Sequence, residues 1–337
     1  MQNTGFRLVD GDAADGMAPA IPRHWIICAV FVIIAQWLLD ALSAPTTAIA
    51  TLVTHYAFAD PLLGSSEGDW WLAIPSIAWL VVPFAAVGCL TIYLSRRFDG
   101  RGHRSLGLHV KAAREALPWL IGGLFASFLS IVRLFTLDFG GEEAALGALP
   151  WLIPATLVQS GAEEVLFRGA LLAMLVARYG ARGGVLISAA LFALWHLYPG
   201  QGLVDTGVLV VTTFIFGVSS AVLTLHQGHI GGAIALHLVW NVVLSVEAGL
   251  ANWGGGHGIL GMFQGGSFWE SYTVNYTRPV MLEDVQSGAA LRSMFFPLFF
   301  ETVLVFAACR LTFDRIFFGA PRALAVASAI DPPTIRE

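Results

Sequence analysis

The stretch SGAEEVLFRGALLA, residues 160–173, places two adjacent glutamates and an arginine inside an apolar run that continues to Ala177. These charges therefore do not mark the end of a hydrophobic segment. A charged side chain at the middle of a membrane-spanning helix costs about 2.5–3.5 kcal/mol on insertion scales, and such residues are rare and usually functional. The stretch indicates a membrane helix that carries a buried polar site.

The composition of the chain supports a membrane protein. Of its 337 residues, 56% are hydrophobic and 12% are charged, and the mean hydropathy is +0.72. Soluble globular proteins carry roughly 25% charged residues, so about half of the usual charge is missing. The three cysteines, Cys28, Cys89 and Cys309, lie in apolar runs without disulfide or zinc-site spacing. We expect an all-α, polytopic bundle of transmembrane helices in a lipid bilayer, with no nucleic-acid partner.

Eight apolar runs have the length and hydropathy expected of membrane spans. They lie at about 25–44, 70–95, 117–137, 149–177, 183–199, 203–225, 229–250 and 290–312. The loops 45–69 and 138–148 have no Lys or Arg, whereas the loop 96–116 carries Arg96, Arg97, Arg101, Arg104, Lys111 and Arg114. Because basic loops stay on the cytoplasmic side, we expect a multi-pass protein of the inner (cytoplasmic) membrane with both termini in the cytoplasm.

The three charges of the opening stretch do not satisfy one another. Glu164 and Arg168 lie four residues apart, so they can pair on one face of the helix. Glu163 points about 100° away from Glu164 around the helix axis, and the pair cannot reach it. Glu163 is therefore expected to find its partner on another span.

Two other predicted spans supply such partners. His196 lies in the span 183–199, and His237 and Asn241 lie four residues apart in the span 229–250. Counted at ~1.5 Å per residue, Glu163 lies about 20 Å and His237 about 12 Å from the cytoplasmic ends of their spans. A lone histidine on an apolar face is usually a packed core residue. Several polar residues on three spans instead predict one site, in the inner half of the bilayer.

In this order, Glu163-Glu164-x-x-x-Arg168, Phe192-x-x-x-His196 and His237-x-x-x-Asn241 resemble the three motifs of the CPBP family. These are the CAAX proteases and bacteriocin-processing enzymes, also called the Abi family and related to the CAAX prenyl protease 2 type. The resemblance covers about residues 148–250. It implies an intramembrane endopeptidase. From the depth inferred for the site, we expect the substrate to be a membrane-anchored protein or a small peptide precursor that is cut close to the cytoplasmic interface.

The resemblance carries over six residues as catalytic: Glu163, Glu164, Arg168, His196, His237 and Asn241. Glu163, without a partner on its own helix, suits the general base that activates water, and His196 suits sharing that water or protonating the leaving amine. Arg168 then positions and neutralises Glu164. His237 and Asn241 are expected to donate hydrogen bonds to the oxyanion of a tetrahedral intermediate.

The same residues permit a metal-assisted reaction. The family is also described as metalloproteases, and Glu163, His196 and His237 are candidate ligands of a Zn²⁺ ion with one position open for water. The HExxH motif of many zinc proteases is missing from the sequence. Both a metal-bound and a metal-free water therefore stay open.

The spans group into a core and accessory segments. The expected segments are a cytoplasmic tail (1–22), accessory transmembrane helices (23–147), a CPBP-like catalytic core (148–250), an extracytoplasmic loop (251–289), a last transmembrane helix (290–319) and a cytoplasmic tail (320–337).

Other functions fit the sequence less well. Intramembrane acids also form proton relays in transporters, and a non-proteolytic membrane scaffold could carry the same residues. A transporter often has two related halves, whereas this chain has one charged core. A serine protease of the rhomboid type could use Ser219 or Ser220 with His237, but it would leave both glutamates without a role.

Overall fold

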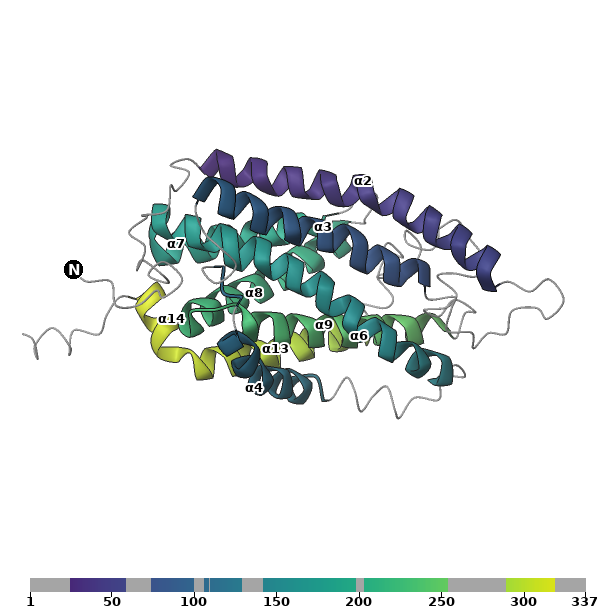
Figure 1. The fold of residues 1–337 in the computed structure, drawn as a ribbon. Helices are drawn as coiled ribbons and strands as arrows, with labels where there is room; N and C mark the ends of the chain where they lie inside the picture. Colours follow the sequence, from purple (N-terminus) through teal and green to yellow (C-terminus); the bar gives the residue numbers. More distant parts are fainter. Residues whose placement is uncertain are drawn as a thin grey trace, which may run out of the picture.

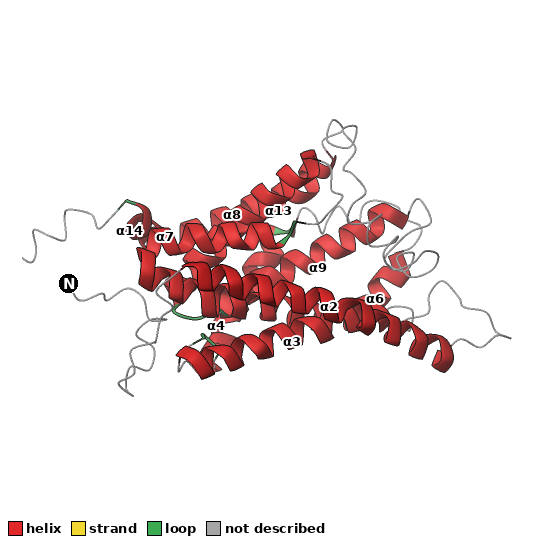
Figure 2. Cartoon of the chain, turned by 90° about the horizontal axis from the view of Figure 1, so that it is seen from above, coloured by secondary structure: helices red, strands yellow, loops and turns green. Residues whose placement is uncertain are grey.

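The computed structural model describes residues 25–58, 74–99, 106–108, 110–128, 142–197, 203–253 and 289–318. Every regular element in these ranges is a helix, as Figures 1 and 2 show, and the all-α fold is confirmed. The predicted tails 1–22 and 320–337 and nearly all of the loop 251–289 lie outside the described residues.

The helices follow the order of the predicted spans. Their bounds are α2 (Trp25–Phe58), α3 (Ile74–Asp99), α4 (Val110–Ala126), α6 (Glu142–Glu164), the π-helix η3 (Val165–Leu171), α7 (Leu172–Trp195), α8 (Leu203–Gln227), α9 (Gly231–Trp253), α13 (Ala289–Ala308) and α14 (Arg310–Phe317).

Four described helical segments are long and apolar enough to cross a membrane. They are Val30–Ala50, Ile77–Arg97, Pro150–Trp195 and Leu209–Gln227, and shorter apolar helices occupy Gly231–Val243 and Leu298–Ala308. The predicted span 117–137 is described only as far as residue 128. The count of eight spans therefore stays a prediction.

The segment Pro150–Trp195 is a hairpin and not one helix. Its 46 residues would extend about 70 Å as a straight helix, more than twice the ~30 Å of a bilayer core. Gly180 interrupts it with φ 73° and ψ 171°, a combination that is essentially restricted to glycine. The Ser188 hydroxyl donates to the Phe167 carbonyl oxygen at 3.2 Å, although a continuous helix would separate these residues by about 30 Å. The two predicted spans on either side of Gly180 are thus antiparallel.

The hairpin lies at the centre of the bundle. Its first arm runs from α6 through η3 to the part of α7 before Gly180, and its second arm is the part of α7 after Gly180. Helix α6 packs against α3 and α9, and α7 packs against α8. Figure 1 shows α2 beside α3 along one edge of the bundle and α13 near α4 on another. Leu106 is fully buried against Gly169, where an added Cβ would lie 2.8 Å from the Leu106 carbonyl oxygen. A helix-connecting segment therefore reaches into the bundle beside η3.

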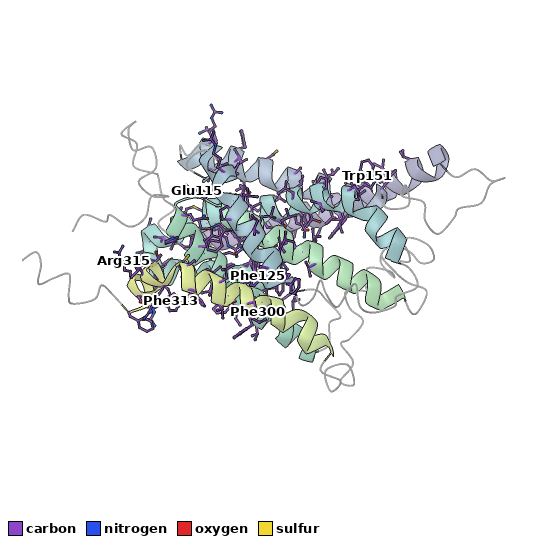
Figure 3. The ribbon with its side chains drawn as sticks, turned by 90° about the horizontal axis from the view of Figure 1, so that it is seen from below. Glu115, Phe125, Trp151, Phe300, Phe313 and Arg315 are labelled. Atoms are coloured by element: carbon purple, nitrogen blue, oxygen red, sulfur yellow. The ribbon has the colours of Figure 1, made fainter. Side chains whose placement is uncertain are left out.

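Large apolar side chains also cover the outside of the bundle. Phe125 is 79% exposed, and Trp151 and Phe300 also point outward (Figure 3). Soluble monomers rarely expose extended apolar surface. This surface, like the apolar helices, is that of a multi-pass membrane protein.

Candidate active site

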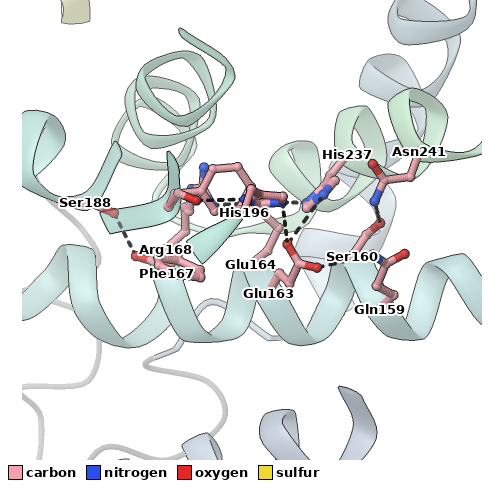
Figure 4. A network of polar contacts seen from close by, with 11 residues as sticks. Gln159, Ser160, Glu163, Glu164, Phe167, Arg168, Ser188, His196, His237 and Asn241 are labelled. Atoms are coloured by element: carbon pink, nitrogen blue, oxygen red, sulfur yellow. Dashed lines mark hydrogen bonds and ion pairs between the residues drawn. The ribbon is translucent and has the colours of Figure 1, made fainter. Parts of the chain in front are cut away.

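The six predicted site residues lie on three neighbouring segments of the core (Figure 4). Glu163 and Glu164 are the last two residues of α6, and Arg168 lies in the middle of η3. His196 directly follows the last residue of α7, while His237 and Asn241 lie in α9. The turn at Gly180 brings the end of α7 back beside the end of α6, and α9 packs against α6.

Glu164 is the centre of a buried ion-pair network. Its Oε1 atom lies 3.2 Å from Arg168 Nη1 and 2.8 Å from His237 Nδ1. All three side chains are 3% exposed or less. Two partners on one carboxylate oxygen offset part of the cost of burying the charges. The network therefore ties α6 and η3 to α9.

Arg168 is held by aromatic faces as well as by charge. Its Cζ atom lies 4.2 Å from the centroid of the Phe192 ring and 5.9 Å from that of Phe167. Among the described residues, none of its three guanidinium nitrogens forms a hydrogen bond. A guanidinium over an aromatic face is stabilised by the ring quadrupole, most strongly where water is excluded. The orientation of the charge toward Glu164 thus depends on Phe192 as well as on the ion pair.

Glu163 faces two imidazoles. Its Oε2 atom lies 3.8 Å from Nε2 of His196 and 3.8 Å from Nε2 of His237. These separations are too long for direct hydrogen bonds, and Oε2 is buried with no hydrogen-bond partner among the described residues. At such separations a single water molecule can contact all three atoms.

The other ring nitrogens fix how the two histidines point. Nδ1 of His196 lies 2.8 Å from the Phe192 carbonyl oxygen, one of the last four carbonyls of α7, which lack the N–H partner that a further α-helical turn would supply. A carbonyl only accepts, so this Nδ1 carries a proton. Nδ1 of His237 likewise donates to Glu164. In their neutral forms, both imidazoles therefore direct an unprotonated Nε2 toward Glu163.

Two polar residues of the site were missed by the sequence analysis. Gln159 Nε2 donates to Glu163 Oε1 at 3.3 Å, and Asn241 Nδ2 donates to Ser160 Oγ at 3.4 Å. Gln159 is four residues before Glu163, a spacing that predicts contact on a helix. The Asn241 contact crosses between helices, and no sequence spacing reveals it.

Phe216 on α8, an apolar side chain that borders the site, was missed for a different reason. The ring centroid of Phe216 lies 5.1 Å from that of His237 and 6.0 Å from that of Phe192. Phe216 is 4% exposed. Nothing in an apolar run distinguishes such a phenylalanine from its neighbours, so only the fold identifies it as a side of the site.

The serine alternative finds no support in the arrangement of α8. Ser219 and Ser220 are buried, and neither hydroxyl has a hydrogen-bond partner among the described residues. No serine–histidine pair with His237 is therefore formed.

The site offers the atom types of a zinc centre. Two imidazole nitrogens and a carboxylate oxygen are ordinary Zn²⁺ ligands. Within the described residues, however, no group of three or more His, Cys, Asp and Glu side chains is close enough together to hold a metal ion. As placed, the three side chains do not fit a metal, and we derive the chemistry below from the side chains and water.

Comparison with known proteins supports the resemblance carried by the three motifs. Residues 145–243 match a family model described as type II CAAX prenyl endopeptidase Rce1-like, which confirms the match to the CPBP and CAAX protease family over this segment. No curated protein and no solved structure matches the chain.

Proposed function

We propose that this protein is an intramembrane endopeptidase of the CAAX type, which hydrolyses a peptide bond with water activated by Glu163 and the two histidines. The observation that carries the proposal is the position of Glu163 Oε2, which is buried and lies 3.8 Å from two imidazole Nε2 atoms. The family match at residues 145–243 supports the same class of reaction.

Glu163 begins the reaction as general base. It takes a proton from the water, whose oxygen attacks the carbonyl carbon of the scissile bond and forms the tetrahedral intermediate. When the C–N bond breaks, the leaving nitrogen needs a proton. The proton that Glu163 took passes to the unprotonated Nε2 of His196, which lies 3.8 Å from Glu163 Oε2. His196 then delivers this proton to the leaving nitrogen, because its side chain is 20% exposed whereas that of Glu163 is 3% exposed. A positioned acid or base of this kind contributes roughly 10²–10⁴-fold to the rate.

Asn241 is the better placed of the two candidate oxyanion donors. Its amide always carries two N–H groups, of which the structure uses one toward Ser160. His237 donates from Nε2 only when both of its nitrogens carry protons, because Nδ1 already donates to Glu164. We therefore assign the oxyanion contact first to Asn241. His237, held by Glu164, orients the water together with Glu163.

The Glu163→Gln variant tests the proposal against the alternatives. The variant keeps the size of the side chain and removes the base, so a protease should lose cleavage of its substrate. A non-proteolytic scaffold would be indifferent to the change. A proton-coupled transporter would instead lose substrate flux in proteoliposomes, with no cleavage in the wild-type protein to compare.

Metal content needs a direct measurement. If Zn²⁺ acts with Glu163, His196 and His237, purified protein should contain close to one metal per chain, and chelation should remove metal and activity together. Elemental analysis that finds a metal-free and fully active enzyme would leave the glutamate–histidine water mechanism alone.

The substrate must reach the site within the membrane. Helical peptide bonds are shielded by their own hydrogen bonds, so cleavage should favour a site near a helix end or a helix-weakening Gly or Pro. We propose a membrane-anchored protein or peptide precursor that is cut near the cytoplasmic interface of the inner membrane. Comparative proteomics of a deletion strain tests this. Accumulation of soluble proteins only, or cleavage sites on the outer face, would contradict it.

A further inference from the structure

The turn of α6 that precedes the two glutamates carries two polar side chains that belong to none of the three motifs. Gln159 is partly buried and donates from Nε2 to Glu163 Oε1 at 3.3 Å. Ser160 is fully buried and accepts from Asn241 Nδ2 at 3.4 Å. Figure 4 shows both contacts on the side of Glu163 away from Arg168.

The Gln159 contact gives the two oxygens of Glu163 different surroundings. Oε1 receives the amide hydrogen bond, whereas Oε2 has no hydrogen-bond partner and faces the Nε2 atoms of His196 and His237. A glutamate carboxylate rotates about its last side-chain bond with a broad, roughly two-fold preference. Without a fixed partner, the carboxylate plane would not be held toward the imidazoles.

We propose that Gln159 is a positioning residue, which holds Oε1 of Glu163 so that Oε2 stays directed at the water between the two histidines. This inference rests on the proposed peptidase function. Gln159 contacts neither imidazole in the described structure, so it acts through Glu163. Its loss should slow the chemical step and leave substrate binding unchanged.

The test compares kcat and KM of purified full-length variants. Gln159→Met has a similar length but no donor, and its kcat should fall about 10- to 100-fold, the range for a hydrogen bond to a charged group. KM should stay within about twofold, since uniform substrate binding is untouched. Gln159→Lys, which restores an N–H donor, should recover most of kcat. Leu157→Met, an exposed position in the same turn, is the matched control and should behave as wild type.

Each result decides between explanations. A Gln159→Met enzyme with wild-type kcat overturns the positioning role, and so does a kcat loss that Gln159→Lys does not recover, because the residue would then act through packing. If Glu163→Gln also cleaves at the wild-type rate, the proposed function itself fails. If Glu163→Gln is inactive and Gln159→Met is not impaired, only the positioning role fails.

Discussion

Among the described residues, two glutamate sites lie buried between apolar helices, and they are built differently. Glu164 on α6 has Arg168 at 3.2 Å and His237 at 2.8 Å on one oxygen. Glu301 on α13 is 2% exposed, yet neither of its carboxyl oxygens has a hydrogen-bond partner among the described residues. Its neighbours in the buried stripe of α13, Leu298 and Val305, are apolar.

The contrast shows that a buried acid alone does not identify a catalytic site in a membrane bundle. The sequence does not distinguish Glu164 from Glu301, since each interrupts a hydrophobic run. The two glutamates differ in their partners: charged and polar side chains from η3, α7 and α9 surround the α6 site, and none surround the α13 site among the described residues. A charge with partners can be kept at a moderate cost, whereas an isolated buried charge is very costly.

The largest expected effect is at the water-activating pair. Glu163→Ala and His196→Ala should each abolish cleavage, a loss of at least ~100-fold, because each removes a proton-transfer group. Both variants should insert and fold, since the hydrogen bonds that they lose, Gln159 to Glu163 and His196 to the Phe192 carbonyl oxygen, each join residues four apart on one helix. Cleavage rates of protein purified at wild-type yield measure this. A wild-type rate in either variant would show that the α6 site is not catalytic.

The second effect, a loss of stability with only partial loss of cleavage, concerns the partner of Glu164. Arg168→Ala should lower the free energy of unfolding by about 3–5 kcal/mol, because it leaves a buried carboxylate without its cation. Yield and activity should fall together. Unfolding in mixed detergent micelles measures the loss, and Arg315→Ala, which removes an exposed arginine on α14, is the control with little expected change. If the two substitutions lowered the free energy of unfolding equally, the buried ion pair of Arg168 would contribute no more to stability than an exposed arginine does.

The smallest effect is expected at the isolated acid. Glu301→Gln should change the free energy of unfolding by less than about 1 kcal/mol, because no ion pair is lost. Glu164→Gln should cost more, since Arg168 then keeps a buried charge without a counter-charge. Comparing the two unfolding midpoints tests this directly. If Glu301→Gln were as damaging as Glu164→Gln, the α13 site would have to be regarded as a second functional centre.

Much of the architecture can be predicted from the sequence. Hydropathy gives the all-α class and most helix positions, and the break between residues 177 and 183 coincides with the turn at Gly180. The four-residue spacing of Glu164 and Arg168 gives their pairing because it depends only on helix geometry. The contacts of Asn241 with Ser160 and of Phe216 with His237 depend on how separate helices pack, and no local pattern encodes them.

The depth of a side chain in the membrane is the property that counting residues along the sequence predicts least well. Glu163 lies sixteen residues before Tyr179, about 24 Å along the helix, whereas His237 lies six residues after Gly231, about 9 Å. The two side chains nevertheless meet. Measured along the helices from the level of these two side chains, the turn at Gly180 therefore lies about 15 Å further away than the start of α9. The ends of different helices thus do not lie at one depth, and residue counts from them give different depths.

The π-helix η3 makes the length of this part of the chain as important as its composition. All seven of its residues are buried, and it begins directly after the two glutamates. A π-turn accommodates one residue more than the α-helical turn it replaces. Loss of any one residue between 165 and 171 would allow ordinary α-helical bonding and would leave α6 and α7 close to their present register, whereas one further inserted residue would rotate them by about 100° relative to each other. The segment should therefore accept a single-residue deletion more readily than a single-residue insertion, because the deletion removes the residue that the π-turn accommodates, whereas the insertion changes the register between the glutamates and the hairpin.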